Sequence, residues 1–150
     1  MLIVRFRLGE RALGIRARDV REVLPVARFR PIPLAPPWVA GDILLHGAPC
    51  PVLDLRRWLD ETPTRIDLAT RLLRIDWAGG ADRPLAILAE RVRDAVAVDD
   101  AAIGAPAVGR PGERVLGGEV VVDGEIVTIL DPAQLVTTEL ATVLYAREDA

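Results

Sequence analysis

The chain has 150 residues, 51% of them hydrophobic, and its 22 acidic residues against 19 basic ones give a net charge of −3. This length suits one ordinary domain, or two very small ones that share a core, and excludes a long multidomain enzyme. The hydrophobic content is enough to bury a core. Because no basic block is present, nucleic acid is excluded as the main partner.

The N-terminus and the single cysteine indicate where the protein works. Arg5 and Arg7 interrupt the first apolar run too early for a signal peptide, and no uncharged apolar stretch approaches the ~18 residues of a membrane helix. Cys50 has no second cysteine with which to form a disulfide, and its apolar surroundings favour a buried, inert thiol. We therefore expect a cytoplasmic protein without direct membrane insertion.

Short apolar runs separated by turn signals follow one another along the chain. They predict strands at residues 2–8, 12–17, 43–45, 50–53, 72–77, 85–88, 119–122 and 126–130. Between pairs of these runs lie turn dipeptides that tolerate positive φ, namely Gly9-Glu10, His46-Gly47, Gly79-Gly80 and Asp123-Gly124. Many short strands joined by hairpins predict an all-β barrel or sandwich.

The two halves of the chain can be laid over each other. Residues 43–54 match residues 120–131 without a gap, and residues 13–24 match residues 85–96. Each half contains two strands, a short turn around Asp19 or Arg91, a further strand, a connector and a closing hairpin. The duplication predicts two similar subdomains, at about residues 1–66 and 67–132, within one domain over residues 1–150.

The segments outside these strands differ in composition. The connector at residues 26–40 is rich in proline and expected to be extended, with a helical turn at residues 37–40, whereas the connector at residues 99–114 is richer in Gly and Ala. A short helix is predicted at residues 55–59, before a polar loop at residues 60–67. Asp131 precedes Pro132 as an N-cap and predicts a C-terminal helix over about residues 132–145.

Catalytic machinery is not evident in the sequence. His46 is the only histidine, and although Cys50 lies four residues away, the two fall on opposite arms of a tight hairpin. Asp54 and Asp131 occupy equivalent strand ends in the two halves, which favours a capping role over an acid-base role. No phosphate-binding loop and no metal-ligand spacing is present, so we expect no enzyme activity, cofactor or metal.

Several motifs together resemble those of the CheW family. Residues 41–47, Gly-Asp-Ile-Leu-Leu-His-Gly, are similar to the family element Gly-Val-x-Asn-Leu-Arg-Gly, and residues 51–56, Pro-Val-Leu-Asp-Leu-Arg, resemble Pro-Val-x-Asp-Leu-Arg. The opening residues 6–15 with residues 20–23, the Pro-Ile-Pro element at residues 31–33 and the closing residues 123–131 follow in the family order. The resemblance runs from about residue 2 to residue 136.

This resemblance implies a fold and a role. The family fold consists of two intertwined five-stranded SH3-like β-barrels packed together, which agrees with the duplication. The family's role is to couple the cytoplasmic tips of chemoreceptors to the regulatory domain of a CheA-type histidine kinase. Because the chain has no kinase core and no receiver domain, the resemblance implies a stand-alone, non-catalytic adaptor associated with receptor arrays.

The resemblance also nominates residues that contact partners. Gly41, Leu44, His46, Gly47 and Arg56 belong to the family motifs, with Leu44 and His46 replacing the family's Asn and Arg. An imidazole cannot make the bidentate, permanently charged contacts of an arginine, so a divergent, non-motility pathway is a further expectation. A groove between the barrels is assigned to Val20, Val23 and Val92, for which a place in the core is an equally open reading, and Trp38 is a candidate interface anchor in the stiff connector.

Two other functions stay open on the sequence. A small ligand-binding or enzymatic β-barrel unrelated to signalling would need a pocket with convergent polar groups. A free-standing homodimer would need no signalling partner.

Overall fold

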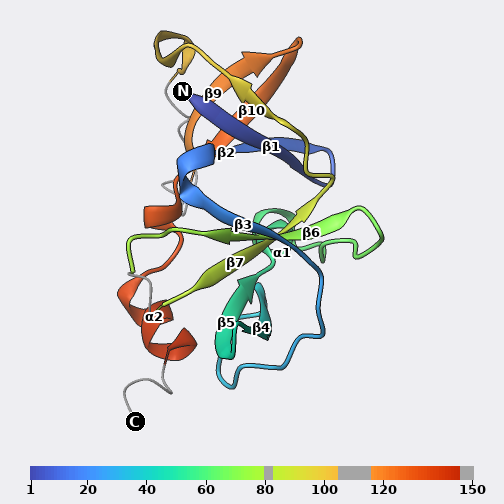
Figure 1. Cartoon of the computed structure of the whole chain (residues 1–150), viewed down its shortest axis with the longest axis vertical. Helices are drawn as coiled ribbons and strands as arrows, with labels where there is room; N and C mark the ends of the chain where they lie inside the picture. Colours follow the sequence, from blue (N-terminus) through green and yellow to red (C-terminus); the bar gives the residue numbers. More distant parts are fainter. Residues whose placement is uncertain (80–82, 105–115, 146–150) are drawn as a thin grey trace.

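The computed structural model describes residues 1–79, 83–104 and 116–145 (Figure 1). Strands dominate these ranges, and the prediction of an all-β fold with short helices is confirmed. The strands are β1 (Leu2–Leu8), β2 (Arg11–Arg16), β3 (Val20–Pro25), β4 (Val39–Leu45), β5 (Ala48–Leu53), β6 (Thr70–Ile75), β7 (Leu85–Glu90), β8 (Ala95–Ala97), β9 (Leu116–Val122) and β10 (Glu125–Leu130). The α-helices are α1 (Leu55–Asp60) and α2 (Thr138–Leu144), and short 3-10 helices lie at Ala17–Asp19, Asp100–Ala102 and Pro132–Gln134.

The predicted hairpin turns join neighbouring strands. Gly9 turns β1 into β2, and the pairs His46-Gly47 and Asp123-Gly124 turn β4 into β5 and β9 into β10. All five of these residues have positive φ, which suits the two-residue turns whose twist matches that of the flanking strands. The Gly79-Gly80 turn lies partly outside the described residues.

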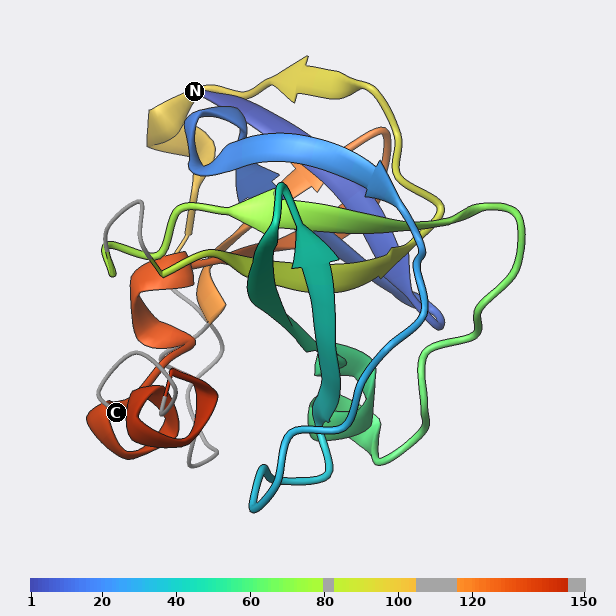
Figure 2. The same ribbon diagram turned by 60° about the horizontal axis from the view of Figure 1, so that its bottom comes forward.

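The strands form two sets of five, which we call set A and set B. Set A contains β3, β6, β7, β5 and β4, and set B contains β8, β1, β2, β10 and β9. A single pairing of Arg7 with Glu90 connects the sets through β1 and β7. In Figure 2 set A and set B lie against each other, and α2 lies to one side of the strands.

Each set takes strands from both halves of the chain, because each closing hairpin pairs with the other half. Val52 and Leu53 of β5 run parallel to Ala86 and Ile87 of β7. In set B, Ile129 and Leu130 of β10 run parallel to Gly14 and Ile15 of β2, which are the equivalent positions in the repeat. Each set therefore contains strands from before and from after the expected subdomain boundary near residue 66. The division into subdomains stays a prediction.

An isolated β-bridge closes each set on itself. Arg30, in the connector after β3, pairs with Asp42 of β4, and Gly104, after β8, pairs with Glu119 of β9. Asp42 and Glu119 are again equivalent in the repeat. Each connector thus adds one backbone pairing that closes its set of strands.

Three apolar clusters fill the molecule. One lies inside set A, around Cys50, Val52 and Leu72, and one inside set B, around Ile3 and Val127. The largest lies between the two sets and includes residues of β1, β2, β5, β6, β7 and β10, of α1 and of α2. Because a buried aliphatic side chain contributes roughly 1.5–3 kcal/mol, this shared cluster joins the sets into one body.

The helices differ in part from the sequence expectation. Asp54 caps α1 as predicted, accepting a hydrogen bond from the amide of Arg57. The single helix expected over residues 132–145 is instead a 3-10 helix capped by Asp131, followed by α2, because Thr137 caps a second start by accepting from the amide of Leu140. The helical turn expected at residues 37–40 is a simple turn, since β4 begins at Val39.

Candidate functional site

The turn between β4 and β5 projects from set A and carries three of the predicted contact residues. His46 and Gly47 form the tip, with φ of 49° and 82°. Leu44, near the end of β4, is 68% exposed and lies opposite the exposed Pro49 of β5. The structure therefore brings Leu44, His46 and Gly47 together on one accessible hairpin, where an apolar patch borders an imidazole.

His46 faces a charged pair on the neighbouring strands. Its Nε2 lies 3.2 Å from Oε1 of Glu22 on β3, and the same oxygen accepts a hydrogen bond of 2.9 Å from Nη1 of Arg74 on β6. Hydrogen bonds from Arg74 and then from His46 lower the pKa of Glu22 below its ordinary value. The site therefore contains a carboxylate that is shared by a guanidinium and an imidazole.

Sequence reasoning did not nominate Glu22 or Arg74 as site residues. The two are 52 positions apart, and they meet because β3 pairs with β6 in a register that places Glu22 opposite Arg74. The available signal was indirect: Glu22 lies between the nominated Val20 and Val23 on a predicted strand, with its side chain on the face opposite that of Val23.

Gly41 has a structural explanation. Its φ of 139° is rarely adopted by residues with a side chain, and a Cβ added there would lie 2.3 Å from the carbonyl oxygen of Arg30. The bridge between Arg30 and Asp42 needs this close approach. Gly118 is its copy in the other half, where an added Cβ would lie 3.0 Å from the carbonyl oxygen of Gly104.

The three valines do not form one open groove. Val23 is exposed on β3, whereas Val20 and Val92 are partly buried against the large cluster between the two sets. Val20 and Val92 therefore fit the alternative prediction that these valines belong to the core. Of the three, only Val23 presents its side chain to the surface.

Arg56 and Trp38 are also engaged within the molecule. Arg56 donates a hydrogen bond of 2.8 Å from Nη1 to Oε1 of Glu90, which ties α1 to the end of β7. Trp38 packs against Trp58 of α1, with 5.9 Å between the ring centroids, at the border of the large cluster. Both residues hold the connector and α1 in place and lie away from the His46 tip.

The equivalent tip in set B has different chemistry. Asp123 occupies the position of His46 and pairs with Arg5 of β1 at 3.2 Å. Val121 and Ile126, which face each other across β9 and β10, are exposed as Leu44 and Pro49 are in set A. Sequence reasoning aligned the two hairpins but did not carry the site over to the second.

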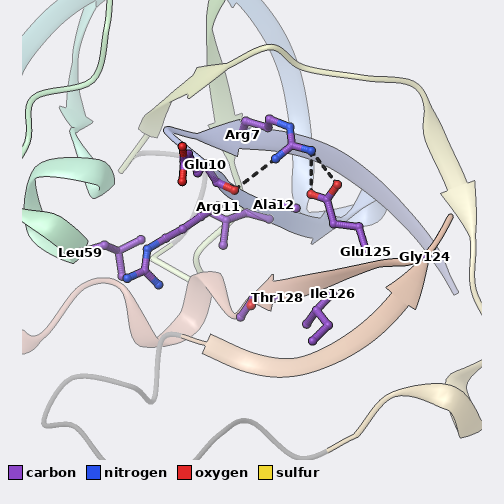
Figure 3. Close-up of a pocket in the computed structure, with 10 residues that line it drawn as sticks. Arg7, Glu10, Arg11, Ala12, Leu59, Gly124, Glu125, Ile126 and Thr128 are labelled. Carbon is purple, nitrogen blue, oxygen red and sulfur yellow. Dashed lines mark hydrogen bonds and ion pairs between the residues drawn. The ribbon is translucent and has the colours of Figure 1, made fainter.

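A recess of about 590 Å³ lies beside the β9–β10 hairpin (Figure 3). Arg7 and Glu125 point toward each other across it, and Nη2 of Arg7 donates to both carboxylate oxygens of Glu125 at 2.7 Å. The guanidinium also donates to the carbonyl oxygen of Glu10, while the side chain of Arg11 extends toward Leu59. The polar groups that converge at the middle of this recess are thus paired with one another.

The described residues contain no group of three or more His, Cys, Asp or Glu side chains that could hold a metal ion. Cys50 is fully buried, and this burial raises the pKa of its thiol to about 12. A thiol that stays protonated and lacks access to solvent is a poor nucleophile, so the pairing of Cys50 with His46 has no support in the geometry.

Comparison with known proteins places the chain in a family. The model of the CheW-like domain matches residues 2–140. Protein FrzA of Myxococcus xanthus is 39% identical over 67 residues, which are 45% of this chain and 42% of that protein. The chemotaxis protein CheW of Treponema pallidum (strain Nichols) is 28% identical over 110 residues, which are 69% of this chain and 62% of that protein. The chain thus spans less than two thirds of the length of either relative.

A solved structure agrees with the described fold. The scaffolding protein TtCheW from Thermoanaerobacter tengcongensis superposes with a TM-score of 0.77 at 23% sequence identity, over 86% of this chain and 82% of that one. Among the described residues, no helix is both long and apolar enough to span a membrane. From the family match over residues 2–140, we conclude that the chain belongs to the CheW-like domain family.

Proposed function

We propose that the protein is a non-catalytic adaptor that couples the cytoplasmic tips of chemoreceptors to the regulatory domain of a CheA-type histidine kinase. The observation that carries this proposal is the match of the CheW-like domain over residues 2–140. The names of two similar proteins, a chemotaxis protein CheW and a scaffolding protein, point the same way. Such an adaptor works in the cytoplasm, at receptor arrays.

The proposed mechanism is passive. An exposed apolar patch beside a charged tip, as at Leu44 and His46, suits protein docking, and the signal passes by a change in which partner conformations are held together. Leu44 and His46 stand where the family has Asn and Arg, which supports a divergent pathway outside motility. A ligand-binding barrel is less well supported, because the polar groups at the centre of the recess beside β9–β10 satisfy one another.

Direct binding tests the proposal. The purified chain is titrated with the regulatory domain of a CheA-type histidine kinase and, separately, with a fragment of a chemoreceptor tip. We expect both to bind, and Leu44→Asp to weaken kinase binding by about tenfold or more, because a carboxylate then replaces the exposed apolar side chain.

Leu34→Asp is the matched control. Leu34 is 94% exposed on the connector, so the same substitution adds the same charge away from the tip and should leave the affinity within about twofold. If the wild-type chain binds neither partner, the proposed coupling function is wrong.

A further inference from the structure

The imidazole of His46 is held at the hairpin tip by contacts that the turn itself does not need. Its equivalent in the other half, Asp123, forms the same turn with a φ of 51°, close to the 49° of His46. Asn, Asp and Gly are the residues that such turns favour, because they tolerate positive φ at low cost. The histidine is therefore not explained by the backbone conformation.

The contacts around His46 also differ from those of the other tip. His46 meets Glu22, whereas Asp123 meets Arg5 directly. Asp94, which aligns with Glu22 in the repeat, is exposed, and in the described part of the chain it forms no hydrogen bond or ion pair with Asp123. The carboxylate beneath the histidine is thus a feature of this hairpin and not of the repeat.

The charges around His46 can be counted. Arg74 on β6 is permanently positive, and Glu22 on β3 stays ionised to a lower pH than an ordinary glutamate, since its pKa is lowered first by the hydrogen bond from Arg74. The cluster of Arg74, Glu22 and His46 is therefore neutral when the imidazole is neutral and carries one positive charge when it is protonated. As long as Glu22 is ionised, the net charge of the cluster is therefore either zero or +1.

The other charged groups of these strands are engaged elsewhere. Asp42 of β4 pairs with Arg30 at 2.8 Å, and Arg21 of β3 pairs with Asp76, which follows β6, at 3.2 Å. The imidazole is 68% exposed, while Glu22 and Arg74 are 33% and 18% exposed. Protonation thus adds its charge at the outermost point of the cluster, where a docked partner would meet it.

We propose that His46 makes partner docking at this hairpin depend on pH, with Glu22 orienting the imidazole, so that an acidic partner surface binds more tightly when the imidazole is protonated. This inference rests on the proposed adaptor function and adds a regulation of the same site. Histidine is the side chain that ordinarily changes charge between pH 5 and 8. The partner is acidic by charge complementarity, because the cluster changes only between neutral and positive.

The test is the affinity of the full chain for the kinase regulatory domain between about pH 5.5 and 8.5, in wild type, His46→Arg and His46→Asn. The wild type should bind about 1.5 to 5 times more tightly at the low end of this range, the ratio that one exposed ion pair supplies. His46→Arg should bind tightly throughout the range, and His46→Asn, which suits the turn, should bind weakly throughout it. Asp123→Asn changes the equivalent tip and should keep the wild-type pH dependence.

The outcomes separate this inference from the function on which it rests. If no variant binds the kinase regulatory domain at any pH, the kinase-binding part of the proposed function, on which this inference rests, is wrong. If wild type, His46→Arg and His46→Asn bind with the same pH dependence, the function stands and the role of His46 is wrong. Because His46 is the only histidine, its single ring resonance also reports its titration, and the midpoint for binding should follow it in wild type.

Discussion

Gly41 shows how one residue fixes the closure of a barrel. The chain reaches φ of 139° there, and the carbonyl of Arg30 occupies the space that a Cβ would need. This packing lets the connector form its bridge with Asp42, whose carboxylate also pairs with Arg30 at 2.8 Å. A glycine that sequence reasoning assigned to partner contact thus has a clear role in the fold.

We expect Gly41→Ala to destabilise the protein by about 2–4 kcal/mol, because it adds backbone strain and a clash with main-chain atoms. Gly47→Ala is the matched control: φ there is 82° and nothing lies within 4 Å of an added Cβ, so the cost should be only about 1 kcal/mol. Urea unfolding of both variants measures the difference. Equal losses of stability would contradict the close approach at Gly41.

Cys50 allows a second test at this scale. Because burial raises the pKa of its thiol to about 12, we expect no appreciable thiolate in the folded protein between pH 7 and 9. An aromatic disulfide reagent should therefore label the native chain ~100-fold or more slowly than the chain unfolded in guanidinium. Leu34→Cys, at an exposed position, should supply a rapidly labelled thiol in the folded protein. Native labelling of Cys50 at the unfolded rate would show that the interior of set A is open.

Local chemistry could be predicted at the residue scale, and distant contacts could not. The His46-Gly47 turn and the capping aspartates follow from neighbours in sequence. The ion pair of Arg56 with Glu90 joins residues 34 positions apart, and it depends on strand pairing that residue types do not specify. For that reason Arg56 was assigned to a partner and Glu22 was missed.

At the scale of elements, the two capping aspartates have unequal roles. Asp54 is buried and accepts from the hydroxyl and amide of Thr64 as well as from the amide of Arg57. Among the described residues, the side chain of Asp131 accepts a hydrogen bond only from the amide of Ala133. The sequence repeat predicted equivalent roles for the two aspartates, because it aligns their positions but does not reveal which loop packs on each cap.

We expect Asp54→Ala to cost about 2–3 kcal/mol, since it leaves the buried donors of Thr64 without an acceptor. Asp131→Ala should cost about 1 kcal/mol, as for an ordinary exposed N-cap. Denaturant unfolding of the two variants compares the losses directly. A larger loss for Asp131→Ala would mean that the packing of Thr64 on Asp54 contributes little.

Strand positions were predictable to within a few residues, whereas the C-terminal helix was not. Alternating and continuous apolar runs fix where strands lie, because each must bury a face. The segment after Asp131 has a second capping residue at Thr137, and two competing helix starts divide it into a 3-10 helix and α2. Helix period alone cannot choose between one helix and two.

At the scale of the whole molecule, the halves of the repeat hold each other together. Set A takes β6 and β7 from the second half, and set B takes β1 and β2 from the first. The repeat could be found in the residues themselves, whereas the intertwining of the halves through this exchange of strands was expected only from the family resemblance, since equivalent strands have the same pattern whichever copy they pair with.

We therefore expect a chain cut in the loop after α1 to remain one folded particle. A protease site inserted between Glu61 and Thr62 allows the cut in the folded protein. Size exclusion and circular dichroism of the cut chain should match those of the intact chain, because the parallel pairs β5–β7 and β2–β10 cross the cut. Separation of the fragments without denaturant would contradict the exchange.

The exchange also constrains the order of events while the chain is being synthesised. Set A lacks a strand until Glu90 of β7 has left the ribosome, and set B lacks one until Leu130 of β10 has emerged. Folding must then bring together strands that are far apart in sequence, a topology that closes slowly. The nascent chain consequently carries unpaired strand edges until β10 has emerged, and this is when it most needs protection from aggregation.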